Sequence, residues 1–101
     1  MFVAIDLETT GLSSEKDQII EVAAVRISED GTIQDEFQTL VNPGVVLPEI
    51  IRHLTGLTDD DLKDAPKIDE VRAEIIEFIG EAPILGHSVQ FDINFLEAND
   101  I

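Results

Sequence analysis

The stretch MFVAIDLETTGL, residues 1–12, ends an apolar run on two carboxylates one residue apart. Residues 2–7 are almost wholly apolar, which is typical of a central strand covered on both faces. Side chains two positions apart on a strand point the same way, so Asp6 and Glu8 project from one face at the strand's carboxyl end, where sites of α/β sheets tend to form. No Lys or Arg lies nearby in the sequence, so a divalent cation is the natural partner for the pair.

A third carboxylate, Asp92, strengthens this interpretation of the pair. It follows GHSVQF (residues 86–91) and falls in the first turn of a predicted helix. A right-handed crossover would lay the preceding strand parallel to the first one and bring Asp92 beside Asp6. Three such groups are hard oxygen ligands for Mg²⁺ or Mn²⁺. Ordinary structural roles are the alternative: Asp6 capping a turn, Glu8 solvated in a loop, and Asp92 stabilising a helix N-terminus.

The remaining pattern predicts an α/β domain with a three-strand antiparallel meander. The turn sequence SEDG (residues 28–31) joins the second and third strands, and the polar third strand suits a sheet edge. Strands are predicted over residues 2–7, 18–28, 32–41 and 82–87, the last one short and buried. Helical segments are predicted over residues 49–54, 58–63, 66–80 and 89–97.

Composition bounds the function. The chain has 101 residues, a net charge of −16 and no cysteine. This length allows one small domain, and no apolar run approaches the roughly 18 residues of a membrane span. The absence of cysteine fits a cytoplasmic protein without disulfides. The acidity argues against nucleic acid unless metal ions, or groups outside these residues, meet the phosphates.

Four motifs, in this order, resemble the DEDD (DnaQ-like) 3′–5′ exonuclease family, in particular its members in bacterial polymerases and helicases. They are AIDLETTGL (4–12), IIEVAAV (19–25), HLTGLTDDDLKDAP (53–66) and GHSVQFDINFL (86–96). The resemblance implies a ribonuclease H-like mixed sheet, with the meander plus a parallel strand in the order third, second, first, fourth. It also implies that residues 1–101 are the N-terminal part of one exonuclease domain, with the C-terminal part of the domain absent.

The resemblance implies roles for named residues. Asp6, Glu8 and Asp92 match the family's catalytic carboxylates, which hold two Mg²⁺ or Mn²⁺ ions for hydrolysis of a 3′-terminal phosphodiester. The ions would then supply the positive charge that the chain lacks. The implied partners are the 3′ end of single-stranded DNA or RNA and a polymerase or helicase subunit or domain, with no membrane. The implied substrate-binding residues are Thr9, Thr10, Leu12, His53, Leu54 and Phe91.

The chain departs from the family pattern at two places. Ser88 stands where the family has Asn after the motif histidine, and the third motif, a His or Tyr followed by a fourth Asp, does not occur. We therefore expect residues 1–101 alone to be weakly active or inactive. His53 and His87 do not occupy the missing motif's place and are interpreted as pocket-edge or helix-packing residues. Glu21 is either a further group beside the site or the exposed start of its strand, and the pattern favours the second.

Two other classes remain open. A partner-binding module that kept the exonuclease fold would bind no divalent cation at its carboxylates. A phosphatase of the haloacid-dehalogenase type would use Asp6 as a nucleophile, since DLETT loosely echoes that superfamily's D-x-D-x-T. Glu8 stands where that motif has Asp, and GHSVQFD has no place in it. The choice between DNA and RNA, and among proofreading, repair and RNA processing, stays open.

Overall fold

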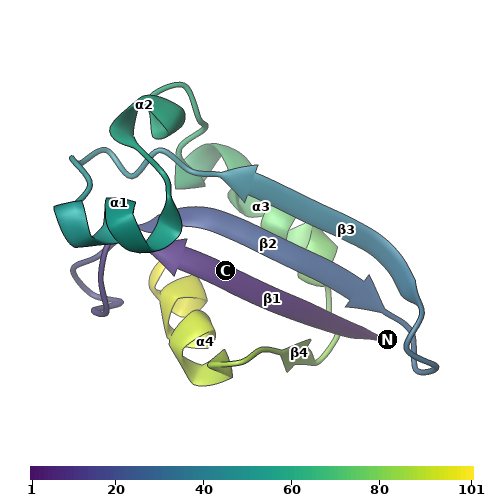
Figure 1. Ribbon diagram of the computed structural model, residues 1–101. Helices are drawn as coiled ribbons and strands as arrows, with labels where there is room; N and C mark the ends of the chain where they lie inside the picture. The colour runs from purple at the N-terminus through teal and green to yellow at the C-terminus, as the bar shows by residue number, and fades with distance from the viewer.

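The computed structural model describes all residues from Met1 to Ile101 (Figure 1). Its centre is a four-stranded sheet in the order β3-β2-β1-β4. Strands β1 (Phe2–Thr9), β2 (Ile19–Ile27) and β3 (Ile33–Leu40) form an antiparallel meander, and β4 (Ile84–Leu85) pairs with β1 in parallel. The predicted α/β mixed sheet and its strand order are confirmed.

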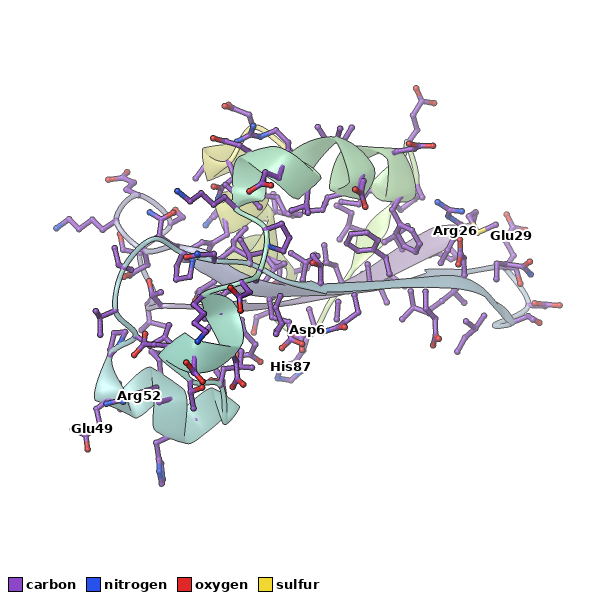
Figure 2. All side chains as sticks on the ribbon, turned by 90° about the horizontal axis from the view of Figure 1, so that it is seen from above. Asp6, Arg26, Glu29, Glu49, Arg52 and His87 are labelled. Atoms are coloured by element: carbon purple, nitrogen blue, oxygen red, sulfur yellow. The ribbon has the colours of Figure 1, made fainter.

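The helices are unequally shared between the two faces of the sheet. Figure 2 shows α3 above one face and α1 on the opposite side, at one end of the strands. No helix has the length and apolar content that crossing a bilayer requires. The helices are α1 (Glu49–Thr55), α2 (Asp59–Leu62), α3 (Ile68–Ile79) and α4 (Val89–Ala98).

The main core lies between the sheet and the helices α3 and α4. Alternate β1 residues Val3, Ile5 and Leu7 are buried there, whereas Asp6 is exposed on the other face. The prediction that β1 is covered on both faces is therefore wrong, because α3 and α4 pack on the same face. Their buried contributions to this core are Val71, Ile75, Phe78, Phe95 and Leu96.

Local signals set the helix ends. Gly56 ends α1 with a φ of 76°, a conformation that glycine adopts without steric cost. The predicted capping box at the start of α2 is present: Asp61 N–H donates to Thr58 Oγ1 at 3.1 Å, and Thr58 N–H donates to Asp61 Oδ2 at 2.9 Å. This box fixes the direction in which the chain leaves α1.

Strand β4 differs from its prediction. Only two residues pair, and Leu85 is 46% exposed, so the predicted buried strand over 82–87 is wrong in both length and burial. The cause is that β4 has a neighbour on one side only. Despite its brevity, β4 fixes the point where the chain turns into α4.

Candidate active site

Two carboxylates lie on the face of the sheet that α3 and α4 leave open. In the β1–β2 register Asp6 faces Ala23 and Glu8 faces Glu21, and the register shifts between Glu8 and Thr9. Directly opposed residues share a face, so Asp6, Glu8 and Glu21 lie together. The shift is a β-bulge, a feature often found beside functional sites. The shift leaves Ile20 without a partner in β1, and Ile20 packs in a separate small core with Leu47 and with Leu62 of α2.

Asp92 reaches the same end of β1 from the first turn of α4. It is 4% exposed, and its approach depends on Gly86. A Cβ at Gly86 would lie 3.1 Å from Asp92 Oδ2 and 3.2 Å from the Ile5 carbonyl oxygen. A side chain at residue 86 would therefore push α4 away from β1. The juxtaposition of Asp92 with the carboxyl end of β1 is the one that the right-handed crossover predicts.

The carboxylates influence one another electrostatically. Burial raises the pKa of Glu8, and the negative charges of Asp6, Glu21 and Asp92 raise it further. Burial also raises the pKa of Asp92, as does the charge of Asp6, while the Leu7 backbone N–H acts in the opposite direction. The site is therefore a region of concentrated negative potential in which ionisation is resisted.

These carboxylates suit a metal ion by their chemistry, but their side chains are not arranged around an ion position. No group of three or more His, Cys, Asp and Glu side chains is arranged to hold an ion. The donor set nevertheless suits Mg²⁺ or Mn²⁺, because it offers hard carboxylate oxygens. A divalent cation would also relieve the repulsion that raises the pKa of Glu8 and Asp92.

Glu21 belongs to this region, against the interpretation that the sequence favoured. It is half-buried and directly opposite Glu8, and Gln38 Nε2 donates a hydrogen bond to Glu21 Oε2 at 2.7 Å. The sequence carries no local signal for this position, because the β-bulge between Glu8 and Thr9 decides which residue of β2 lies opposite Glu8.

Replacing Glu21 with glutamine should stabilise the cation-free protein near neutral pH. Like charges directly opposite on neighbouring strands destabilise a sheet, so we expect about 0.2–1 kcal/mol of added unfolding free energy at about pH 7. Because the pKa of Glu8 is raised in the folded state, ionising Glu8 costs stability as the pH rises through that pKa. The gain should therefore shrink as the pH is lowered toward about 4, because protonation of Glu8 removes the charge that Glu21 opposes.

Urea denaturation with a chelator present, at both pH values, measures this effect. Glu36→Gln is the matched control, since Glu36 is exposed and lies opposite Val25, on the same face but away from Glu8. An equal gain in unfolding free energy from both variants would mean that the gain comes from the general acidity of the chain and not from repulsion between Glu21 and Glu8.

An apolar cleft begins where the carboxylates end. It has a volume of about 430 Å³ and runs between the end of β1, the following loop and α1. Two of its lining side chains stand largely in solvent, Leu12 at 88% and Leu54 at 71% exposed. Glu8 belongs both to the cleft wall and to the carboxylate group. The other lining residues are Leu7, Thr9, Thr10, Gly11, Ile50, Ile51, Thr55 and Phe91.

The structure places five of the six predicted substrate-binding residues in this cleft: Thr9, Thr10, Leu12, Leu54 and Phe91. His53 is the exception, because it is exposed on α1 and does not line the cleft. Thr55 belongs to the segment LTGLT (residues 54–58), which the family resemblance also places at this pocket, whereas sequence reasoning missed Ile50 and Ile51. The i, i+4 spacing of Ile50 and Leu54 on α1 was the available signal for the first of these.

The other two residues singled out in the sequence are both exposed. They are Ser88 and His87. Ser88 is the N-cap of α4 and makes no side-chain capping hydrogen bond. Figure 2 shows His87 on the same side of the sheet as Asp6, the side that α3 leaves open. His87 is thus an exposed side chain on that side of the sheet rather than a residue packed in a helix interface.

Comparisons with known proteins agree with this arrangement. The chain is 48% identical over 95 residues to the DNA polymerase III subunit epsilon of Aquifex aeolicus, and this match covers 94% of the chain and 46% of the relative. It is 48% identical over 96 residues to a PolC-type DNA polymerase III of Staphylococcus haemolyticus, covering 95% of the chain and 7% of the relative. The chain thus spans less than half the length of these relatives.

Two solved structures with similar folds are those of exonucleases. Exonuclease X in complex with 5′ overhanging duplex DNA superposes with a TM-score of 0.79 at 27% identity, over 95% of this chain and 54% of the other. Exonuclease I of E. coli, in complex with an oligonucleotide, has a TM-score of 0.83 at 20% identity, over 94% of this chain and 22% of the other. This likeness is one of fold, and the fold is ribonuclease H-like. Residues 3–101 match the family RNase_T, described as exonuclease, and the chain belongs to that family.

Proposed function

We propose that the chain is part of a metal-dependent 3′–5′ exonuclease that hydrolyses the 3′-terminal phosphodiester of single-stranded DNA. One observation carries the proposal: Glu8 joins a group of carboxylates to an apolar cleft of about 430 Å³. The cleft is suited to the base and sugar of an end nucleotide, and the carboxylates are suited to the cations that meet its phosphate.

Asp6, Glu8 and Asp92 are the residues that would hold two Mg²⁺ or Mn²⁺ ions. When bound, such ions polarise the phosphoryl oxygens and lower the pKa of water to yield a nucleophile near neutral pH. The residues of this chain shape the approach of the substrate to the ions. The open face of the sheet lets a phosphate approach Asp6 and Glu8, and Gly86 allows Asp92 to reach them. The net charge of −16 disfavours phosphate binding elsewhere on the surface.

The relatives favour DNA and a replication setting. Their names place them in DNA polymerase III, and the Exonuclease X structure contains DNA. We therefore propose a DNA polymerase as the partner and the cytoplasm as the location. RNA is the runner-up substrate, because apolar and aromatic contacts of this kind hold single strands of either nucleic acid.

Residues 1–101 alone should trim DNA slowly or not at all. They contain three of the four carboxylates of the family pattern and neither the His nor the Tyr of its third motif. The expected result with a 5′-labelled single-stranded oligonucleotide and Mn²⁺ is a faint ladder of products shortened from the 3′ end, or no ladder, and no product with a chelator. Rapid trimming would contradict the need for further residues.

A calorimetric titration with Mn²⁺ separates the enzyme part from the binding module. We expect saturable binding that is lost in the Asp6→Asn variant. A chain that binds no Mn²⁺ would overturn the metal-dependent mechanism and favour a module that kept the fold without the chemistry. Binding of an RNA and a DNA oligonucleotide of the same sequence, measured in parallel with Mn²⁺ present, compares the two substrates.

A further inference from the structure

Two hydrogen bonds between Thr10 and Gln18 close the base of the loop that joins β1 to β2. The Thr10 N–H donates to the Gln18 carbonyl at 2.8 Å, and the Gln18 N–H donates to Thr10 Oγ1 at 2.9 Å. Inside the loop, the Asp17 N–H donates to the Ser13 carbonyl at 2.7 Å. Thr10 is buried, so the base of the loop is anchored in the protein rather than in solvent.

Asp17 is the side chain that ties this loop together. Its Oδ1 accepts from the Thr10 hydroxyl at 3.2 Å, and its Oδ2 accepts from the Ser13 N–H at 2.9 Å. Its carboxylate also packs directly on Gly11, where a Cβ would lie 2.6 Å from Asp17 Cγ. Asp17 forms no ion pair, so its charge is used only by these neighbours.

The contacts of Asp17 with Thr10, Gly11 and Ser13 surround one further residue of the loop, Leu12. It lies between Gly11 and Ser13, both of which Asp17 contacts, and it is 88% exposed on the rim of the cleft. A single exposed leucine is ordinary on a flexible loop. Here the backbone on both sides of Leu12 is fixed, which keeps the side chain at the cleft mouth across from Leu54 on α1.

We propose that Asp17 is a positioning residue, which holds Leu12 at the cleft rim so that it packs against the terminal base of the bound strand. This inference rests on the proposed function and adds to it the residue that sets the grip on the end nucleotide. Asp17 acts through Leu12 and does not touch the substrate. Its own negative charge repels the nucleic-acid backbone, so loss of the charge alone would strengthen binding.

The test uses a single-stranded oligothymidylate with 2-aminopurine at its 3′ end, in the presence of Mn²⁺. Packing of the terminal base against Leu12 should change the fluorescence of the 2-aminopurine. For Asp17→Ala we expect the dissociation constant to rise about ten-fold, corresponding to partial loss of a leucine's apolar contact, and the fluorescence change to shrink. Asp17→Asn should bind as tightly as wild type or slightly tighter, because an amide can accept from the Ser13 N–H and donate to Thr10 Oγ1 while the negative charge is lost.

Two controls separate positioning from charge and from direct contact. Glu15→Ala removes the same charge from an exposed residue of the same loop and should leave binding unchanged or slightly tighter. Adding Asp17→Ala to Leu12→Ala should cost no further affinity, because both changes remove one contact. In the free protein, hydrogen exchange of the Ser13 and Gln18 amides should accelerate in Asp17→Ala and stay at the wild-type rate in Asp17→Asn.

The outcomes separate the inference from the function on which it rests. If wild type gives no fluorescence response at the 3′ end, the proposed function is overturned. If wild type responds and Leu12→Ala weakens binding while Asp17→Ala does not, only the positioning role is overturned. Should Asp17→Ala fail to fold, Thr10→Val decides, since it removes the hydroxyl that donates to Asp17 while keeping the side chain's shape. Wild-type affinity in Thr10→Val would then overturn the proposal that Asp17 positions Leu12.

Discussion

Replacing Phe95 with alanine is expected to lower the free energy of unfolding by about 3–5 kcal/mol. Phe95 is 0% exposed and lies at the centre of the main core, with its ring centroid 4.9 Å from that of Phe91. Total stability of a domain of this size is about 5–15 kcal/mol, so the variant should be marginal at room temperature. Urea denaturation followed by circular dichroism measures the loss.

Phe91→Ala is the matched control for this prediction. Phe91 lies one turn earlier on α4, but it is half-buried and lines the cleft. The Phe91→Ala variant should therefore lose less unfolding free energy than Phe95→Ala, and it should bind the 3′-terminal nucleotide more weakly. Equal losses of stability would mean that the α4 contact with β1 depends on the aromatic pair as a whole rather than on Phe95.

The parts of the fold that could be predicted from the sequence are those that local patterns determine. The turn at residues 28–31 and the β-branched run before it gave the meander, and the crossover rule placed the fourth strand beside β1. The capping box of α2 and Gly56 followed from residue types at fixed spacing. The juxtaposition of Asp92 with β1 followed from the same handedness argument.

What could not be predicted depends on three-dimensional partners that no single segment encodes. The apolar run of β1 suggested burial on both faces, but α3 and α4 pack on one face and leave Asp6 exposed. The position of Glu21 depends on register across a β-bulge, which inserts one residue and changes which side chains oppose Glu8. His53 lies outside the cleft because the helical phase of α1 presents Ile50 and Leu54 to it instead.

Replacing Asp6 with asparagine is expected to lower the affinity for Mn²⁺ by more than about 100-fold, since even groups that only orient a metal ligand are typically worth 10–100-fold. Asparagine keeps the size of the side chain and removes the charge that the cation would meet. Asp6 is exposed on the open face of the sheet, so the change creates no cavity and should leave the fold intact. Calorimetric titration measures the affinity, and any trimming of DNA should fall with it.

A second readout of the same variant needs no metal ion. The charge of Asp6 helps to raise the pKa of both Glu8 and Asp92, so Asp6→Asn should lower both values. Carboxyl ¹³C NMR titration measures them directly. Asp64→Asn, an equivalent change at an exposed residue outside the site, should alter neither the two pKa values nor the Mn²⁺ affinity. If Asp6→Asn lowers both pKa values but binds Mn²⁺ as wild type does, the carboxylates are coupled but Asp6 is not a ligand. The metal site would then have to be built from Glu8, Asp92 and groups other than Asp6.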